Sequence, residues 1–176
     1  MMTTMIFLLM AIMVNNQKLF DFSEKSNLDN WLVVNDDVMG GRSTATFQLT
    51  GKGSAIFKGK VSLENYGGFS SIRYKLGKTN IGGNKILAIR LKGDGKNYQV
   101  RIREKESDYF SYITTFQTSG EWETVEVPLQ KMYPSFRGRK LDRPDFNGSA
   151  IVELTFLIGN KKAEEFTLEL REAALK

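Results

Sequence analysis

Short runs in which apolar and polar residues alternate constrain the fold of this chain most strongly. In the segment 85–91 the apolar side chains of Leu87, Ile89 and Leu91 recur at every second position. A period of two places successive side chains on opposite faces of an extended strand, so this pattern predicts a half-buried β-strand. Similar runs cover residues 98–103, 110–118, 122–127, 152–158 and 166–170. The glycine-containing segment 93–97 between the first two runs predicts a hairpin connection.

About ten such strands are predicted between Leu19 and Arg171, with a short helical turn at 27–31 as the only helical signal. Many short strands separated by turn residues are typical of an all-β sandwich or jelly roll. The segment 130–149 carries no strand pattern, so we interpret it as a long ordered loop. The predicted organisation is one domain over residues 18–176.

Residues 1–17 lie outside the predicted domain, because residues 5–14 form an uninterrupted apolar run. Ten helical residues would rise about 15 Å, roughly half the hydrocarbon core, so the run is too short to span a membrane. Its length fits the apolar region of a secretory signal peptide, which predicts an exported, periplasmic or secreted protein. The alternative is an apolar N-terminal tail on a cytoplasmic or membrane-associated protein.

Two missing residue types narrow the chemistry, because the chain contains neither histidine nor cysteine. Disulfides, thiolate metal sites, Ser-His-Asp catalysis and the usual zinc sites are therefore excluded. Phosphate-loop and dinucleotide-binding motifs are absent as well, so no cofactor is expected. No metal site is predicted either; Asp142, Asp145 and Asn147 could offer oxygen ligands to calcium, but their spacing does not match an EF-hand loop. This composition predicts a protein that is not an enzyme.

The net charge is +5, and its excess is concentrated between residues 131 and 143. That segment has five basic residues and a single acidic residue: Lys131, Arg137, Arg139, Lys140 and Arg143, and Asp142. A basic loop on a surface of mixed charge indicates an anionic partner rather than nucleic acid.

The segment 35–43 holds the densest group of candidate binding residues: Asp36, Asp37, Arg42 and Ser43, with two adjacent glycines. An arginine in such a cluster can fork onto an anionic or hydroxylated ligand. Aspartate and glycine are also ordinary turn formers, so the same residues can form an internal structural network instead. Both interpretations stay open at this stage.

The strand arginines Arg73, Arg90, Arg101 and Arg103 form a second candidate set. Arg101 and Arg103 share one face of their strand, so a row of arginines on paired strands would either line a binding face or lie on a solvated outer face. Aromatic rings could serve as platforms for the apolar face of a sugar, or they could pack in the core. The aromatic candidates are Tyr98, Tyr109, Tyr112 and Trp122.

These residues occur in an order that resembles the complex I intermediate-associated protein 30 family. The resemblance rests on NDDVMGGRS at 35–43 followed by YGGFSSIR at 66–73. The later run from Tyr112 to Val125, the Pro-Leu pair at 128–129 and Phe136-Arg137-Gly138 also resemble the family. The resemblance covers nearly the whole chain from Leu19 onward.

The resemblance implies a galactose-binding-like β-sandwich, similar to some carbohydrate-binding modules. It also implies a non-enzymatic assembly factor or chaperone with a protein partner, possible partners being subunits of respiratory NADH:ubiquinone oxidoreductase. The chain is expected to be a bacterial stand-alone member. Arg137 joins the candidate residues through its motif, and the three motifs could converge on one end or face of the sandwich. A carbohydrate-binding module that holds a glycan on the sandwich face is the alternative function.

Overall fold

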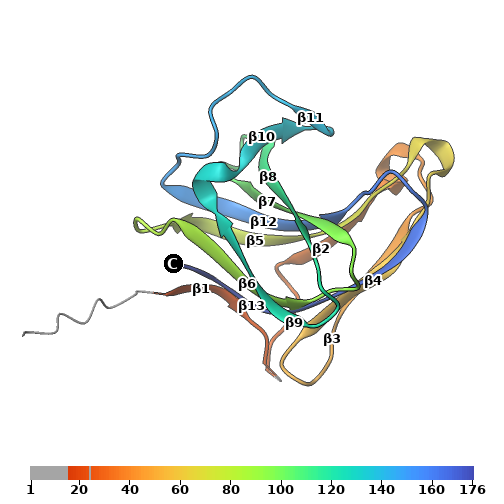
Figure 1. Cartoon of the computed structure of the whole chain (residues 1–176), viewed down its shortest axis with the longest axis horizontal. Helices are drawn as coiled ribbons and strands as arrows, with labels where there is room; N and C mark the ends of the chain where they lie inside the picture. The colour runs from red at the N-terminus through yellow and green to blue at the C-terminus, as the bar shows by residue number, and fades with distance from the viewer. Residues whose placement is uncertain (1–15, 24) are drawn as a thin grey trace, which may run out of the picture.

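The computed structural model describes residues 16–23 and 25–176, which form two antiparallel sheets packed face to face (Figure 1). Sheet A has the order β3-β4-β13-β6-β9, and β1 also pairs with β13. Its strands are β1 (Gln17–Asp21), β3 (Thr44–Leu49), β4 (Ala55–Val61), β6 (Ile86–Lys92), β9 (Trp122–Pro128) and β13 (Glu164–Leu175). Together with the second sheet they confirm the predicted β-sandwich.

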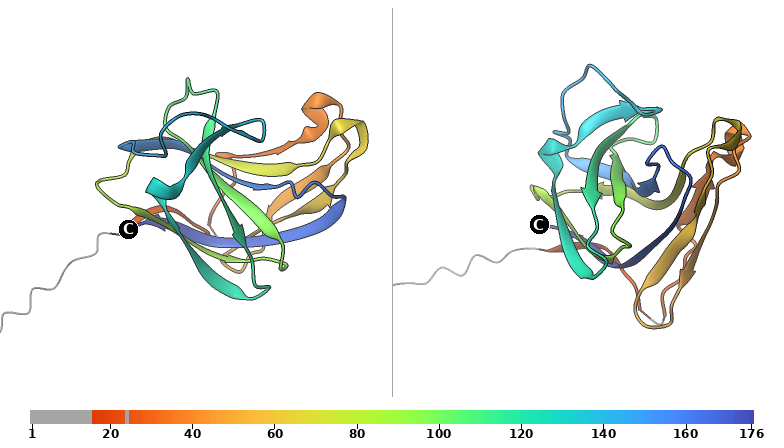
Figure 2. Two further views of the ribbon diagram at one scale, coloured as in Figure 1. Left: turned by 45° about the horizontal axis from the view of Figure 1, so that its top comes forward. Right: turned by 45° about the vertical axis from the view of Figure 1, so that its right-hand side comes forward.

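Sheet B has the order β11-β10-β8-β7-β12-β5-β2. Its strands are β2 (Trp31–Asn35), β5 (Ser70–Asn80), β7 (Asn97–Arg103), β8 (Ser111–Gln117), β10 (Tyr133–Phe136), β11 (Arg139–Lys140) and β12 (Ala150–Ile158). Three 3-10 turns complete the described elements: η1 (Asp36–Met39), η2 (Glu64–Tyr66) and η3 (Leu129–Lys131). In both views of Figure 2, η1 and η2 lie side by side at one end of the sandwich.

The core fills the space between the sheets, as the alternating pattern predicts. Leu87, Ile89 and Leu91 of β6 are fully buried in the core, whereas Arg90, which lies between the last two, is only half-buried. β12 is different, because all nine of its residues are buried on both faces. Its inner side chains belong to the core, and its outer ones lie between the neighbouring strands β5 and β7, which pair with β12 on either side.

The predicted hairpin at 93–97 is wrong. β6 pairs with β13 and β9 in sheet A, whereas β7 pairs with β8 and β12 in sheet B, so the connection crosses between the sheets. Arg90 on β6 therefore lies in the other sheet from Arg73, Arg101 and Arg103. The glycine turn was correctly located, but its residue types fit a crossing as well as a hairpin.

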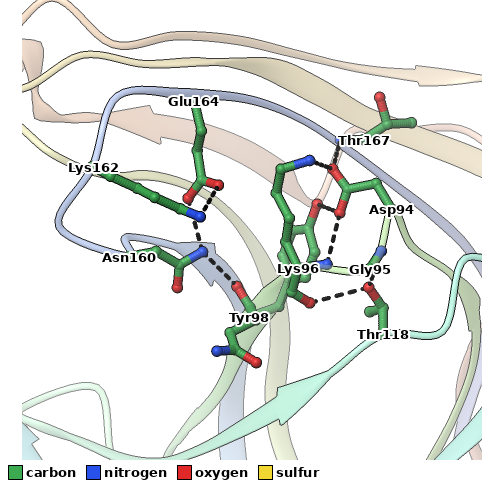
Figure 3. A network of polar contacts seen from close by, with 10 residues as sticks. Asp94, Gly95, Lys96, Tyr98, Thr118, Asn160, Lys162, Glu164 and Thr167 are labelled. Atoms are coloured by element: carbon green, nitrogen blue, oxygen red, sulfur yellow. Dashed lines mark hydrogen bonds and ion pairs between the residues drawn. The ribbon is translucent and has the colours of Figure 1, made fainter.

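Asp94 fixes this crossing through a network of polar contacts (Figure 3). Its carboxylate accepts hydrogen bonds from the Tyr98 hydroxyl at 3.0 Å, the Lys96 ammonium at 2.8 Å and the Thr167 backbone N–H at 2.9 Å. Burial alone would raise the pKa of Asp94, but these donors hold it below its usual range. Because Thr167 lies on β13, the carboxylate ties the crossing to the centre of sheet A.

Three further expectations need correction. The described residues contain thirteen strands rather than about ten, and the segment 130–149 contributes β10 and β11 rather than only a loop. The segment 27–31 forms a single turn, closed by a hydrogen bond from the Trp31 N–H to the Leu28 carbonyl at 2.8 Å, and no helix.

The predicted signal segment, residues 1–17, lies almost entirely outside the described residues. The first described strand begins at Gln17, one residue before the predicted domain boundary. Among the described residues, no helix is long and apolar enough to cross a membrane.

Candidate functional site

Asp36 is the centre of the 35–43 cluster, and its carboxylate is only 1% exposed. One oxygen accepts the Ser43 backbone N–H at 2.9 Å. The other accepts the Ser43 hydroxyl at 2.5 Å and the backbone N–H groups of Gly68 at 2.6 Å and Phe69 at 3.3 Å. Burial would raise the pKa of Asp36, but these four donors together lower it. The carboxylate is therefore a structural anchor that joins the first two sequence motifs.

Two glycines allow the backbone to approach this carboxylate. A Cβ atom on Gly41 would lie 2.3 Å from an Asp36 carboxylate oxygen, and one on Gly67 would lie 2.5 Å from the other. No side chain fits at either position without a shift of the carboxylate or the backbone. For Asp36 and Ser43, which is itself buried, the geometry supports the structural interpretation of the cluster.

The other charged residues of the motifs lie at the surface. Arg42 forms an exposed ion pair with Glu64 at 3.3 Å, and Asp37 is exposed on η1. Arg137 is exposed in the turn between β10 and β11, with its guanidinium 5.3 Å from the Phe136 ring centre. In the order of sheet B, β10 and β11 lie at one edge, whereas β2, which leads into the segment 36–43, lies at the opposite edge. The first two motifs thus meet, while the third does not join them.

The aromatic candidates are distributed over three environments. Tyr98 is 1% exposed and Tyr112 is 9% exposed, and both face the core, so neither is available as a sugar platform. Trp122 is half-buried on the outer face of sheet A, where the Arg171 guanidinium lies 4.6 Å from its ring centre and that of Arg90 5.9 Å. Tyr109 is 59% exposed, at the end of the sandwich near Phe136.

Arg73 and Arg101 come together on the outer face of sheet B. Thr155 of β12 pairs with Arg73 of β5 on one side and with Arg101 of β7 on the other. The flanking residues of each strand are core residues, so these three side chains share the outer face. We call Arg73 and Arg101 the arginine pair.

The guanidinium of Arg101 is oriented by a neutral partner. Its Nε and Nη2 atoms donate to the Gln99 amide oxygen at 3.1 and 2.6 Å. Burial lowers the pKa of Arg101, and the nearby charge of Arg73 lowers it further. Among the described residues, no carboxylate lies within ion-pair distance of either member of the arginine pair.

The acidic residue on this face is already paired. Glu153 of β12 accepts from Arg103 at 2.8 Å, and its other oxygen accepts the Thr155 hydroxyl at 3.3 Å. Glu153 was missed by the sequence analysis, although its position between apolar residues in the 152–158 run placed it on the outer face. The outer face of sheet B thus combines the Arg103–Glu153 ion pair with an arginine pair for which the described residues supply no counterion.

A model of the family described as Complex I intermediate-associated protein 30 matches residues 20–170. The chain is 26% identical to complex I intermediate-associated protein 30, mitochondrial, of Drosophila melanogaster over 146 residues, which are 70% of this chain and 49% of that protein. It is 24% identical to the Mus musculus protein of the same name over 186 aligned residues, which cover 91% of this chain and 56% of that protein. The chain spans about half the length of the curated relatives it matches.

Among solved structures, the chain is similar to the family 11 carbohydrate-binding module from Clostridium thermocellum, determined in complex with a β-1,3-1,4-mixed-linked tetrasaccharide. The two share a TM-score of 0.65 and 17% identity, covering 91% of this chain and 94% of the module. At this identity the likeness concerns the fold. It confirms the predicted galactose-binding-like jelly roll.

Proposed function

Because the chain belongs to the complex I intermediate-associated protein 30 family, we propose that it is a non-catalytic protein-binding module that assists the assembly of respiratory NADH:ubiquinone oxidoreductase. The observation that carries this proposal is the match of the family model over residues 20–170, which include most of both sheets. The named relatives are complex I intermediate-associated proteins. The proposed partners are subunits of that respiratory enzyme or of its assembly intermediates.

The end of the sandwich that bears β10 and β11 supports a protein-binding role. Tyr109 and Phe136 are 59% and 38% exposed and pack edge to face, with ring centres 5.2 Å apart. Arg143 and Arg137 stack on these two rings at 5.8 and 5.3 Å. Exposed aromatic and arginine side chains are the residue types that dominate the binding energy of protein interfaces.

Affinity purification of the full chain from detergent-solubilised membranes of cells that express it tests this proposal. Recovery of respiratory-enzyme subunits, and a loss of the assembled enzyme on native gels when the gene is deleted, are the expected results. Absence of any respiratory subunit, together with normal levels of assembled enzyme in the deletion strain, would refute the assembly role. N-terminal sequencing of the native protein in each cell fraction would establish whether the predicted export takes place.

Glycan binding is the second candidate function, and the jelly-roll fold with its polar outer face on sheet B favours it. Isothermal titration of the purified chain with the β-1,3-1,4-mixed-linked tetrasaccharide provides a direct test. Saturable binding that is lost in Arg101→Gln would support this function. No heat change at millimolar tetrasaccharide would eliminate that glycan as a ligand.

A further inference from the structure

The arginine pair places two positively charged side chains close together on the outer face of sheet B. Arg73 on β5 and Arg101 on β7 flank Thr155 of β12, and, after burial, the charge of Arg73 lowers the pKa of Arg101 further. The exposed fraction of both side chains is intermediate, so water screens this repulsion only in part. The two positive charges therefore repel each other, and a bound anion would relieve this repulsion.

The hydrogen bonding of Arg101 leaves most of its binding capacity unused. A guanidinium has five N–H donors, and Gln99 accepts two of them with its single amide oxygen. A neutral acceptor fixes the orientation of the guanidinium but leaves its positive charge intact. Glu153 does not neutralise it, because this carboxylate is ion-paired with Arg103 and lies outside ion-pair distance of Arg101. Arg101 is thus oriented for an oxyanion supplied from outside, beside the positive charge of Arg73.

The surroundings extend this positive character across the face. Lys75 and Arg103 lie on either side of Glu153 in the strand register, and Lys140 lies over the Tyr133 ring at 5.3 Å. Tyr133, in register with Ile113 and covered by this ammonium group, is the one aromatic residue on the outer face of the described strands of sheet B. An uncovered ring for stacking on a sugar is therefore missing from the described part of this face, and charge dominates its chemistry.

We propose that the outer face of sheet B, centred on Arg73 and Arg101, docks an acidic segment of a partner protein through the carboxylates of its Asp or Glu side chains. Charge complementarity selects this occupant, because the face presents five cations to one carboxylate that is already paired. Arginine binds a carboxylate in a bidentate fork, which gives direction as well as attraction. This inference rests on the proposed protein-binding function and names the chemistry of the partner.

Fluorescence anisotropy of a fluorescein-labelled octaglutamate peptide with the purified full chain tests the proposal. We expect saturable binding that weakens as salt rises from 50 to 200 mM. The double variant Arg73→Gln/Arg101→Gln should weaken the affinity for the peptide at least about tenfold, which is the effect of losing one charge-assisted contact. The control Arg42→Gln/Arg171→Gln removes the same charge elsewhere and should change the affinity less than about twofold.

Thermal unfolding of the same variants separates a binding role from a structural one. Loss of an internal support would lower the melting temperature, whereas relief of the repulsion should leave it unchanged or raise it. Arg73→Gln alone, for which no hydrogen bond is broken in the described structure, repeats the binding test if the double variant fails to fold.

Three results would overturn the proposal. They are equal weakening in both double variants, absence of octaglutamate binding, and preferential arginine-pair-dependent binding of polygalacturonate, which would assign the face to an acidic glycan. The assembly role fails separately: peptide binding with no co-purified respiratory subunit refutes that role alone. Conversely, undiminished recovery of subunits by Arg73→Gln/Arg101→Gln refutes only the docking face.

Discussion

Replacement of Asp36 by asparagine should destabilise the domain far more than its small change in shape implies. The carboxylate accepts four hydrogen bonds in a site that is 1% exposed. An amide has one acceptor oxygen and one N–H₂ group, so it matches only one side of this site. In either orientation of the amide, a backbone N–H of Ser43 or of Gly68 would face another donor.

The magnitude follows from the bonds that are lost. A hydrogen bond to a charged group contributes about 1.5–3 kcal/mol, and a buried donor left without a partner costs about 1–3 kcal/mol. Asp36→Asn should therefore lower the free energy of unfolding by about 3 kcal/mol or more. For a domain of this size, that loss corresponds to a decrease in melting temperature of about 6–12 °C.

Urea denaturation followed by circular dichroism measures this change, because a lower midpoint at constant slope reports a loss of stability alone. Asp142→Asn makes the same chemical change at an exposed position and should stay within about 0.5 kcal/mol of the wild type. A melting temperature of Asp36→Asn within about 2 °C of the wild type would refute the anchor interpretation.

Three further predictions concern the same stabilising networks. Gly67→Ala places a Cβ 2.5 Å from the Asp36 carboxylate and should cost about 1–3 kcal/mol in urea denaturation, whereas a neutral effect would show that the loop can shift. Tyr98→Phe removes the 3.0 Å hydrogen bond to Asp94 and should cost about 1–2 kcal/mol in thermal melts, and equal melting curves would contradict this. Folding lowers the pKa of Asp36 and Asp94, so the stabilisation that these carboxylates give is complete above their unfolded pKa near 3.8 and is lost as the pH falls through their folded pKa. In thermal melts from pH 6 to 2.5, the melting temperature of Asp94→Asn should therefore decline less steeply than that of the wild type, and parallel declines would contradict this.

The alternating pattern predicts which side chains enter the core, because burial on one face leaves a period of two in the sequence. It does not predict which sheet a strand joins. The residues at 93–96 fit a hairpin and a crossing equally well, and the choice depends on Asp94 accepting the Thr167 N–H, 73 positions away. A local sequence pattern does not predict a contact between residues so far apart in the chain.

The same limit applies to the candidate site. Residue types at 35–43 fit a structural turn and a ligand site alike, and it is the N–H groups of Gly68 and Phe69, 32 and 33 positions away, that identify Asp36 as an anchor. A row of strand arginines was predicted, and Arg73 and Arg101 do share a face. The register with Thr155, which brings the two together, and the pairing of Glu153 with Arg103 required the assembled sheet.

Burial of β12 on both faces makes it the segment of the domain whose amide protons should exchange most slowly. It forms strand ladders with β5 and β7 along most of its length, so its amides become accessible only when the whole domain unfolds. A partner that binds Arg73 and Arg101 therefore binds above a backbone that is already rigid. Little backbone conformational entropy of this domain is lost on binding. Hydrogen exchange in β12 would then report global stability alone, whereas local protection by a bound partner would be visible in the edge segments β2, β10 and β11.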